Sequence, residues 1–201
     1  MNHDHEKQKA RTRRGHKRGH GPSSSFNMHD PKLVFDSLRL KPGDTALDLG
    51  CGPGDYSMRL AEIVKEHGKV YALDMWEQAV DRLKEKAPAN IIPMTHDITT
   101  PLPLPKGGID LCLISTVLHI MGLETKGRAI LREVRRVLKP SGELAVIECK
   151  KEDQPWGPPK ERRLAPQDVE AAAGACGFEK SGLVDLGFTY LITFQPNKNF
   201  A

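Results

Sequence analysis

A glycine-rich segment is the part of this sequence best suited to holding a ligand. Leu47–Gly54 reads LDLGCGPG, and an apolar run precedes it while helically spaced apolar residues follow it. Glycines let the backbone approach a bound molecule closely, and the free amides at a helix N-terminus attract polar ligand atoms. The segment is therefore predicted to be a ligand-binding loop between a strand and a helix.

Asp55, the residue after this loop, distinguishes between two kinds of ligand. A dinucleotide-binding loop of the GxGxxG type requires glycine at position 55, where this chain has Asp55. A carboxylate there would place negative charge against a pyrophosphate. A positively charged sulfonium with a zwitterionic methionine tail meets no such objection.

Two further carboxylates follow the next two predicted strands. Asp74 ends the strand predicted over 69–73, where a carboxylate can accept both hydroxyls of a ribose. Asp97 follows the strand predicted over 91–95, where it can accept the amino group of adenine. Ligands of parallel α/β sheets bind beyond the carboxyl ends of the strands. A glycine loop followed in order by these two acids therefore predicts an adenosine site.

The elements that position these residues alternate between strand and helix. Strands are predicted over 45–49, 69–73, 91–95, 109–114, 144–147, 178–185 and 188–194, and helices over 33–40, 56–64, 79–83, 123–138 and 166–176. This alternation predicts an α/β fold, a Rossmann-like seven-stranded and mostly parallel sheet with helices on both faces. The last two strands lie too close for a helical crossover, so they should form an antiparallel C-terminal hairpin.

Charge is distributed unevenly along the chain. Residues 1–20 contain seven Lys/Arg and the two acids Asp4 and Glu6, so this segment has a formal charge of +5. The whole chain has a formal net charge of +4, so the remaining 181 residues sum to about −1. Residues 1–25 also lack apolar periodicity and are predicted to be a basic, His-rich flexible arm. Residues 26–201 are predicted to be one folded domain. Residues 7–18 could contact nucleic acid, although the nearly neutral domain does not favour it.

The whole pattern resembles the class I S-adenosylmethionine-dependent methyltransferases, in the group containing ubiquinone/menaquinone C-methyltransferases and arsenite methyltransferases. The resemblance covers residues from about 30 to 195. Besides Leu47–Gly54, it rests on residues 73–75, 96–98, 109–119 and 132–142. It implies that the domain is a methyltransferase domain with S-adenosylmethionine as its cofactor.

The resemblance also implies a cofactor-binding set. It consists of Asp48, Gly50 and Gly52 at the methionine end, Cys51 in the cofactor loop, Asp74 at the ribose, Met75, Asp97 and Ile98 around the adenine, and Ser115 with its carbonyl near the ligand's amino group. No metal site is predicted, because the four cysteines are widely scattered without metal-ligand spacing.

Candidate catalytic residues follow the fourth and fifth predicted strands. Methyl transfer from a sulfonium is a direct displacement, so a base is needed only if the acceptor is not already ionised. His119 and Glu148 are the candidates for catalysis, and Thr116 and Cys149 lie near the same opening. The alternative for His119 is a structural histidine hydrogen-bonded under the loop.

Candidate substrate contacts lie in two other segments. Phe26 and Met28 are predicted to fold over the cofactor. Trp156 belongs to a Pro-rich segment that can cover a substrate, and Arg162, or its neighbour Arg163, can meet an anionic acceptor. The alternative for this segment is a rigid surface connector.

The predicted function is S-adenosylmethionine-dependent methyl transfer to a small-molecule acceptor. One alternative is an RNA or protein methyltransferase anchored by the basic arm, and another is a non-catalytic cofactor-binding protein. The longest apolar stretch, Ile109–Met121, is shorter than the roughly 20 residues that span a bilayer, so no membrane span is predicted. Scattered cysteines and no visible secretory signal predict a cytoplasmic location. Neither the acceptor nor the oligomeric state follows from these patterns.

Overall fold

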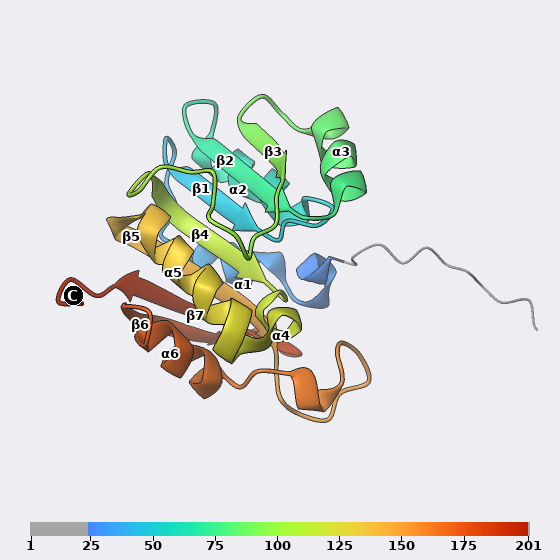
Figure 1. Cartoon of the computed structure of the whole chain (residues 1–201). Coiled ribbons are helices and arrows are strands. Elements are labelled where there is room, and N and C mark those ends of the chain that lie inside the picture. Colours follow the sequence, from blue (N-terminus) through green and yellow to red (C-terminus); the bar gives the residue numbers. More distant parts are fainter. Residues whose placement is uncertain (1–23, 201) are drawn as a thin grey trace, which may run out of the picture.

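The computed structural model describes residues 24–200, which form one seven-stranded sheet in the order β3-β2-β1-β4-β5-β7-β6 (Figure 1). The strands are β1 Thr45–Leu49, β2 Lys69–Asp74, β3 Ile91–Thr95, β4 Ile109–Ser115, β5 Leu138–Cys149, β6 Phe178–Asp185 and β7 Thr189–Pro196. β1 to β5 pair in parallel, whereas β7 runs antiparallel to both β5 and β6. The predicted fold class and the C-terminal hairpin are confirmed.

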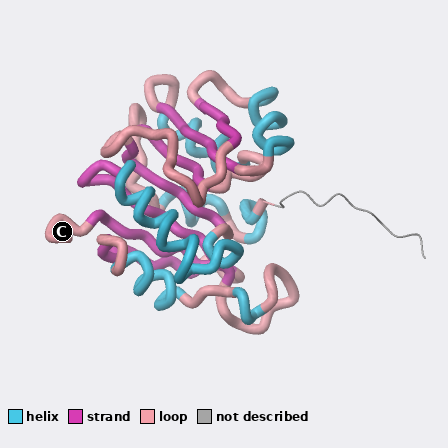
Figure 2. Tube along the Cα trace, in the orientation of Figure 1, coloured by secondary structure: helices cyan, strands magenta, loops and turns pink. Residues whose placement is uncertain are grey.

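Helices cover both faces of the sheet (Figure 2). They are η1 Ser25–Met28, α1 Pro31–Asp36, α2 Asp55–Val64, α3 Glu77–Lys86, α4 Leu118–Met121, η2 Gly122–Gly127, α5 Arg128–Val137, η3 Lys160–Arg162 and α6 Pro166–Gly174. Apolar residues of α1, α2 and α3 pack on one face, and those of α4, α5 and α6 pack on the other. This two-sided packing explains why the central strands are almost entirely apolar.

Some predicted boundaries were wrong for identifiable reasons. The helix predicted over 33–40 ends at Asp36, because Ser37 caps it with its backbone amide. The helix predicted over 123–138 consists of the π-helical turn η2 followed by α5, which ends at Val137. Apolar spacing marks one continuous stripe and does not distinguish the two helix types.

The fifth strand also begins earlier than predicted. Leu138 leaves α5 in an extended conformation and pairs with Ile109 of β4, and the register then shifts before Leu111 pairs with Glu143. This irregularity accommodates the Lys-Pro-Ser-Gly segment that the sequence predicted to be a turn. The pairing is regular again toward the carboxyl end of the strand.

The strand order places the candidate residues at one edge of the sheet. β1 lies between β2 and β4, so the chain reverses its direction of progress across the sheet at the β1–β4 pair. Such a switch point opens a crevice at the carboxyl ends of the strands. Gly50, Asp74, Thr116 and Glu148 lie at or just beyond the ends of β1, β2, β4 and β5.

Candidate functional site

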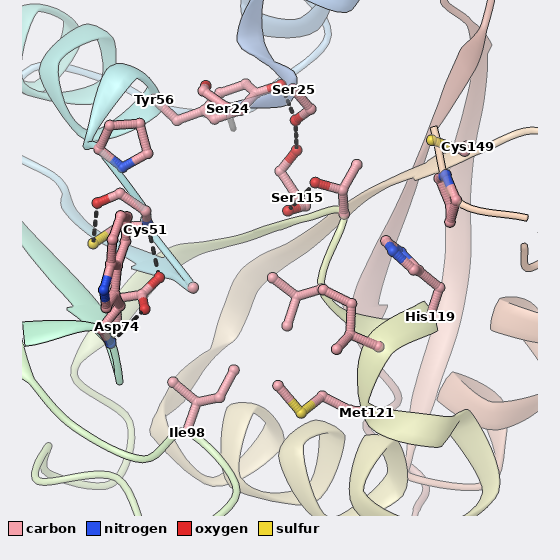
Figure 3. A pocket seen from close by; sticks show the side chains of 18 of the residues that line it. Ser24, Ser25, Cys51, Tyr56, Asp74, Ile98, Ser115, His119, Met121 and Cys149 are labelled. Carbon is pink, nitrogen blue, oxygen red and sulfur yellow. Dashed lines mark hydrogen bonds between the residues drawn. The ribbon is translucent and has the colours of Figure 1, made fainter. Parts of the chain in front are cut away.

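A pocket of about 640 Å³ lies at this switch point (Figure 3). Its wall is built from the glycine loop, the ends of β2 and β4, η1, α4 and part of the loop after β5. Asp74 and Cys51 lie on one side of it, and His119 and Cys149 lie on the other. The volume falls within the range of small-molecule and cofactor sites, roughly 300–1,000 Å³.

The glycine loop and Asp74 are joined by hydrogen bonds. The amide of Gly52 donates to one carboxylate oxygen of Asp74 at 2.8 Å, and the amide of Trp76 donates to the other at 2.8 Å. The amides of Gly50 and Cys51 both donate to the carbonyl of Leu73, at 2.8 and 3.0 Å. These contacts fix the carboxylate at the pocket wall, where each of its oxygens can accept a further hydrogen bond.

Two glycines of the loop meet different constraints. Gly50 has a φ of 81°, and a Cβ there would lie 2.5 Å from a methyl carbon of Val117, so only glycine fits. Gly52 has a φ of 50°, and a Cβ there would meet no protein atom within 4 Å. The space beside Gly52 is therefore free for a ligand.

Of the three predicted adenine contacts, two line the pocket and one does not. Met75 and Ile98 line the pocket, so an apolar ring has a surface on which to pack. Asp97 is exposed and does not line the pocket; its carboxylate accepts bonds from the amide and hydroxyl of Thr99. A contact from Asp97 to adenine therefore stays a prediction, and the structure gives this side chain a turn-forming role.

Asp48 lies in β1, outside the residues that line the pocket, and is 1% exposed. Its carboxyl group accepts a 2.5 Å hydrogen bond from the hydroxyl of Ser57 in α2. Burial raises the pKa of Asp48 to about 7, and the nearby Asp74 carboxylate acts in the same direction. The side chain therefore ties the start of α2 to β1 behind the glycine loop.

A buried histidine–carboxylate pair faces the pocket from the opposite side. Nδ1 of His119 lies 2.7 Å from Oε2 of Glu148, and the His119 amide donates to the other carboxylate oxygen at 3.3 Å. Glu148 is fully buried, while His119 lines the pocket. An ionised carboxylate only accepts, so we assign the proton of this contact to Nδ1 of His119; in the neutral imidazole, Nε2 is then an acceptor.

Thr116, between β4 and α4, is strained. Its φ of 55° is unusual for a β-branched residue. Its amide donates to the carbonyl of Ile147 and its hydroxyl to the carbonyl of Ser115, both at 2.8 Å. The carbonyl predicted to receive the cofactor's amino group thus already has one partner and keeps its second lone pair.

The segment preceding α1 closes one wall of the pocket. The hydroxyl of Ser25 lies 2.7 Å from that of Ser115 and 3.2 Å from that of Tyr56. Tyr56 also contacts Nε2 of His29 at 3.0 Å, and Nδ1 of His29 lies 2.9 Å from the hydroxyl of Thr189. Ser25, which the sequence assigned to the flexible arm, is buried in this network, while residues 1–23 of that arm lie outside the described residues.

Phe26 and Met28 of this segment differ in their position relative to the pocket. Met28 lines the pocket, in agreement with its expected place near the ligand. Phe26 does not line it; its ring packs edge-on against Tyr56, with ring centres 5.1 Å apart. Phe26 therefore supports the wall from behind.

The loop between β5 and α6 reaches the pocket through Gly157 and Pro158. Trp156 and Arg162, the predicted substrate contacts in this loop, do not line the pocket and are exposed. Trp156 packs near Phe188 instead, with ring centres 6.2 Å apart. The part of this loop that meets the pocket is therefore its glycine and proline.

Arg163 organises this loop, a role that the sequence did not reveal. Its side chain is buried, and its guanidinium donates to the carbonyls of Lys150, Glu152, Trp156 and Pro158 at 2.6–3.3 Å. Neighbouring arginines look alike in sequence, and only the fold shows that one of them is buried. A planar fork of N–H donors suits several carbonyls at once.

Comparisons with known proteins show the family to which this chain belongs. The family model described as "Methyltransferase domain" matches residues 40–179. A solved S-adenosylmethionine-dependent methyltransferase from Aquifex aeolicus is 28% identical, with a TM-score of 0.78 over 88% of this chain and 94% of that one. The chain belongs to the methyltransferase domain family, and its cofactor is S-adenosylmethionine, as the sequence predicted.

Named relatives are longer than the matched region. A 2-phytyl-1,4-naphtoquinone methyltransferase of Synechococcus elongatus is 32% identical over 67% of this chain and 58% of that protein. A demethylmenaquinone methyltransferase of Oceanobacillus iheyensis is 31% identical over 62% of this chain and 53% of that protein. The chain thus spans little more than half the length of these relatives.

The residues that line the pocket suit the chemical groups of S-adenosylmethionine. A carboxylate suits the ribose hydroxyls, and the free space at Gly52 and the apolar side chains of Met75 and Ile98 suit the rest of the molecule. Among residues 24–200, no group of three or more His, Cys, Asp and Glu side chains gathers as a metal site does. No helix of this part is long and apolar enough to cross a membrane.

Proposed function

We propose that this protein transfers a methyl group from S-adenosylmethionine to a small-molecule acceptor, with His119 accepting the acceptor's proton. The observation that carries the proposal is His119, which lies across the pocket from Asp74 (Figure 3) and is hydrogen-bonded to the buried Glu148 behind it. One side of the pocket then holds the methyl donor and the other presents a base. The two halves are arranged for a displacement between them.

The charge of the lining favours a neutral acceptor. Within residues 24–200, Asp74 is the only carboxylate that lines the pocket, and no lysine or arginine of this range lines it. Hydroxyl groups, such as those of Ser25 and Thr116, and apolar side chains make up most of the acceptor side. Among the described lining residues, a phosphate or carboxylate on the acceptor would find no cationic partner, and burying it unpaired would be costly.

The named relatives favour an aromatic acceptor derived from a quinone. In a reduced quinone, His119 takes the proton of a ring hydroxyl at Nε2, and the electron pair released into the ring makes a ring carbon nucleophilic. That carbon forms a bond to the methyl group as the carbon–sulfur bond breaks, and the sulfur keeps the bonding pair. The methylated carbon then loses its proton to water, and the ring oxygen takes back the proton held by His119, which restores the aromatic quinol and releases one proton in all.

Each residue of the proposed mechanism has a distinct task. S-adenosylmethionine supplies the electrophilic methyl group. Asp74 and the glycine loop orient the donor, and η1 excludes water from one side. Glu148 holds Nδ1 of His119 protonated and stabilises the imidazolium that forms, so the proton is accepted at Nε2.

The test measures S-adenosylhomocysteine release with a panel of quinols, phenols, thiols and RNA. Turnover with a quinol or phenol is expected. His119→Gln and Glu148→Gln should each lower kcat by roughly 10²-fold or more, with little change in cofactor affinity. His67→Gln is the matched control, because His67 is exposed and remote from the pocket.

Three results would refute the proposal. Full turnover by both variants would remove His119 from the chemistry. Cofactor binding without product release on the whole panel would favour the non-catalytic alternative, and release with RNA alone would favour a nucleic-acid acceptor.

A further inference from the structure

The side chains that line the pocket differ in how deeply they lie in the protein. Ile120 lines the pocket and is 68% exposed, whereas Cys149 lines it and is only 2% exposed. Cys149 is the last residue of β5, and its side chain lies on the same side of the pocket as His119 (Figure 3). The Cys149 thiol therefore forms part of the inner wall on the side that presents the proposed base.

Gly157 meets this inner wall from the loop between β5 and α6. It lines the pocket, and its φ of 81° lies in the left-handed region that favours glycine. A Cβ added to Gly157 would lie 3.3 Å from Sγ of Cys149, which is tighter than an ordinary van der Waals contact. A side chain at position 157 would therefore take up space beside the thiol at the wall of the pocket.

Both sides of this contact are held in place by other parts of the fold. Cys149 pairs with the buried Thr189 in the ladder between β5 and β7. The guanidinium of Arg163 donates to the carbonyls of Trp156 and Pro158, the two neighbours of Gly157, at 2.8 Å each. Because packed protein interiors yield little, a group added between the loop and β5 would narrow the pocket.

The thiol of Cys149 is suited to forming a wall and poorly suited to reacting. Burial raises the pKa of Cys149, and the Glu148 carboxylate acts in the same direction while Arg163 opposes it. The thiol therefore stays protonated at neutral pH, and the thiolate is the nucleophilic form. A protonated thiol does not compete with the acceptor for the methyl group and packs as a small apolar surface.

From these contacts we propose that Gly157 is a specificity-determining residue. Its missing side chain, opposite the thiol of Cys149, sets how wide a ring system the acceptor side admits. The inference rests on the proposed function, because it takes the His119 side of the pocket as the acceptor site. A methyl group at position 157 should therefore hinder a fused two-ring acceptor much more than a one-ring acceptor.

The test compares two stable probes, phenol with one ring and 1-naphthol with two fused rings. Each is titrated calorimetrically into the full chain saturated with S-adenosylhomocysteine, and the readout is the Kd of 1-naphthol divided by that of phenol. Gly157→Ala is expected to raise this ratio at least about fivefold, since one methylene in a pocket is worth roughly tenfold or more.

Cys149→Val narrows the same space from the strand, where valine is well tolerated and no left-handed residue is changed. It should raise the ratio in the same direction as Gly157→Ala. The double variant Gly157→Ala/Cys149→Ala removes the sulfur that the new methyl group meets. Its ratio should return to within about twofold of the wild-type value, because contacting sites are not additive.

Gly43→Ala is the matched control for backbone strain. Gly43 has a φ of 89°, does not line the pocket, and a Cβ there would meet no atom of the described residues within 4 Å. Its ratio should equal that of the wild type. An unchanged ratio in Gly157→Ala and Cys149→Val would overturn the inference. A double variant as impaired as Gly157→Ala, or a shifted ratio in Gly43→Ala, would also overturn it, because strain would then be the cause.

Turnover with the acceptor panel is measured on the same proteins, so the two claims can fail separately. If an acceptor turns over while the ratio of Kd values ignores position 157, the inference about ring size fails and the proposed function stands. If the ratio changes as expected while no acceptor is methylated, the proposed function fails and the wall at Gly157 stands as a feature of ligand binding.

Discussion

Asp48 shows how a buried carboxyl group makes this fold depend on pH. In the unfolded chain it loses its proton near the ordinary pKa of 3.8, whereas burial holds the native pKa at about 7. Between these values the native state binds the extra proton, so the free energy of unfolding falls as pH rises. Above about pH 7 both states are ionised and this contribution no longer changes.

The Asp48→Asn variant should lack this dependence. Urea unfolding at about pH 5 and about pH 7 is expected to show that the wild-type protein loses stability relative to the variant across the interval. Asp81→Asn, at an exposed position in α3, should parallel the wild type. If the free energies of unfolding of the wild type and Asp48→Asn differ by the same amount at both pH values, Asp48 titrates normally.

Bound S-adenosylmethionine should favour the ionised form of Asp48, because the ligand is positively charged and the resemblance places it near this residue. Cofactor affinity is therefore expected to rise with pH toward about 7 in the wild type. Calorimetric titrations in buffers with different ionisation enthalpies would detect the released proton. A pH-independent affinity with no proton release would contradict this linkage.

The conformation of the loop between β5 and α6 depends on one buried side chain, that of Arg163. Its guanidinium joins four carbonyls of residues 150–158, and no salt bridge to it exists within the described chain. Arg163→Ala would leave four carbonyls of the loop without this donor, at a cost of about 1–3 kcal/mol in unfolding free energy. Because Gly157 and Pro158 would lose their fixed position, KM for the acceptor should rise about tenfold while cofactor affinity changes little.

The neighbouring residue provides the control for this prediction. Arg162→Ala removes an exposed guanidinium and should leave stability and KM near wild-type values. Arg163→Lys should recover only part of the loss, since an ammonium cannot reach all four carbonyls. Equal effects of the two alanine variants would show that the loop does not depend on the buried side chain.

The η1 segment is the second element whose role can be tested alone. Ser25→Ala removes the hydroxyl that lies between Tyr56 and Ser115 and should loosen this wall. We expect cofactor affinity to fall about three- to tenfold, the cost of one lost buried hydrogen bond. Ser141→Ala, at an exposed position that does not line the pocket, is the control, and an unchanged affinity in Ser25→Ala would contradict the role.

The elements themselves were largely predictable from the sequence, because apolar spacing and glycine positions are local signals. The strand over Thr45–Leu49 and the final hairpin were read correctly, whereas the start of β5 depends on a register shift against β4. The burial of Arg163, the bridge made by Ser25 and the strained backbone of Thr116 arise from long-range packing. No pattern in the neighbouring sequence predicts such contacts.

At the scale of the whole molecule, the fold determines the position of the site and leaves the reaction open. The [4+2]-cyclase SpnF shares this architecture at 19% identity with a TM-score of 0.70, so the fold alone is compatible with different chemistry. What separates the possibilities is the lining of the pocket. In the proposed function, Asp74 and the glycine loop bind the methyl donor, and His119 with Glu148 acts on the acceptor.

We propose that this pocket binds S-adenosylmethionine through Asp74, and calorimetric titration measures that binding. S-adenosylmethionine is titrated into the wild type, Asp74→Asn and the exposed control Asp81→Asn. We predict saturable one-to-one binding that is unchanged in Asp81→Asn and at least about tenfold weaker in Asp74→Asn, because the ribose hydroxyls lose a charged acceptor. No binding by the wild type, or equal affinity in Asp74→Asn, would contradict the account.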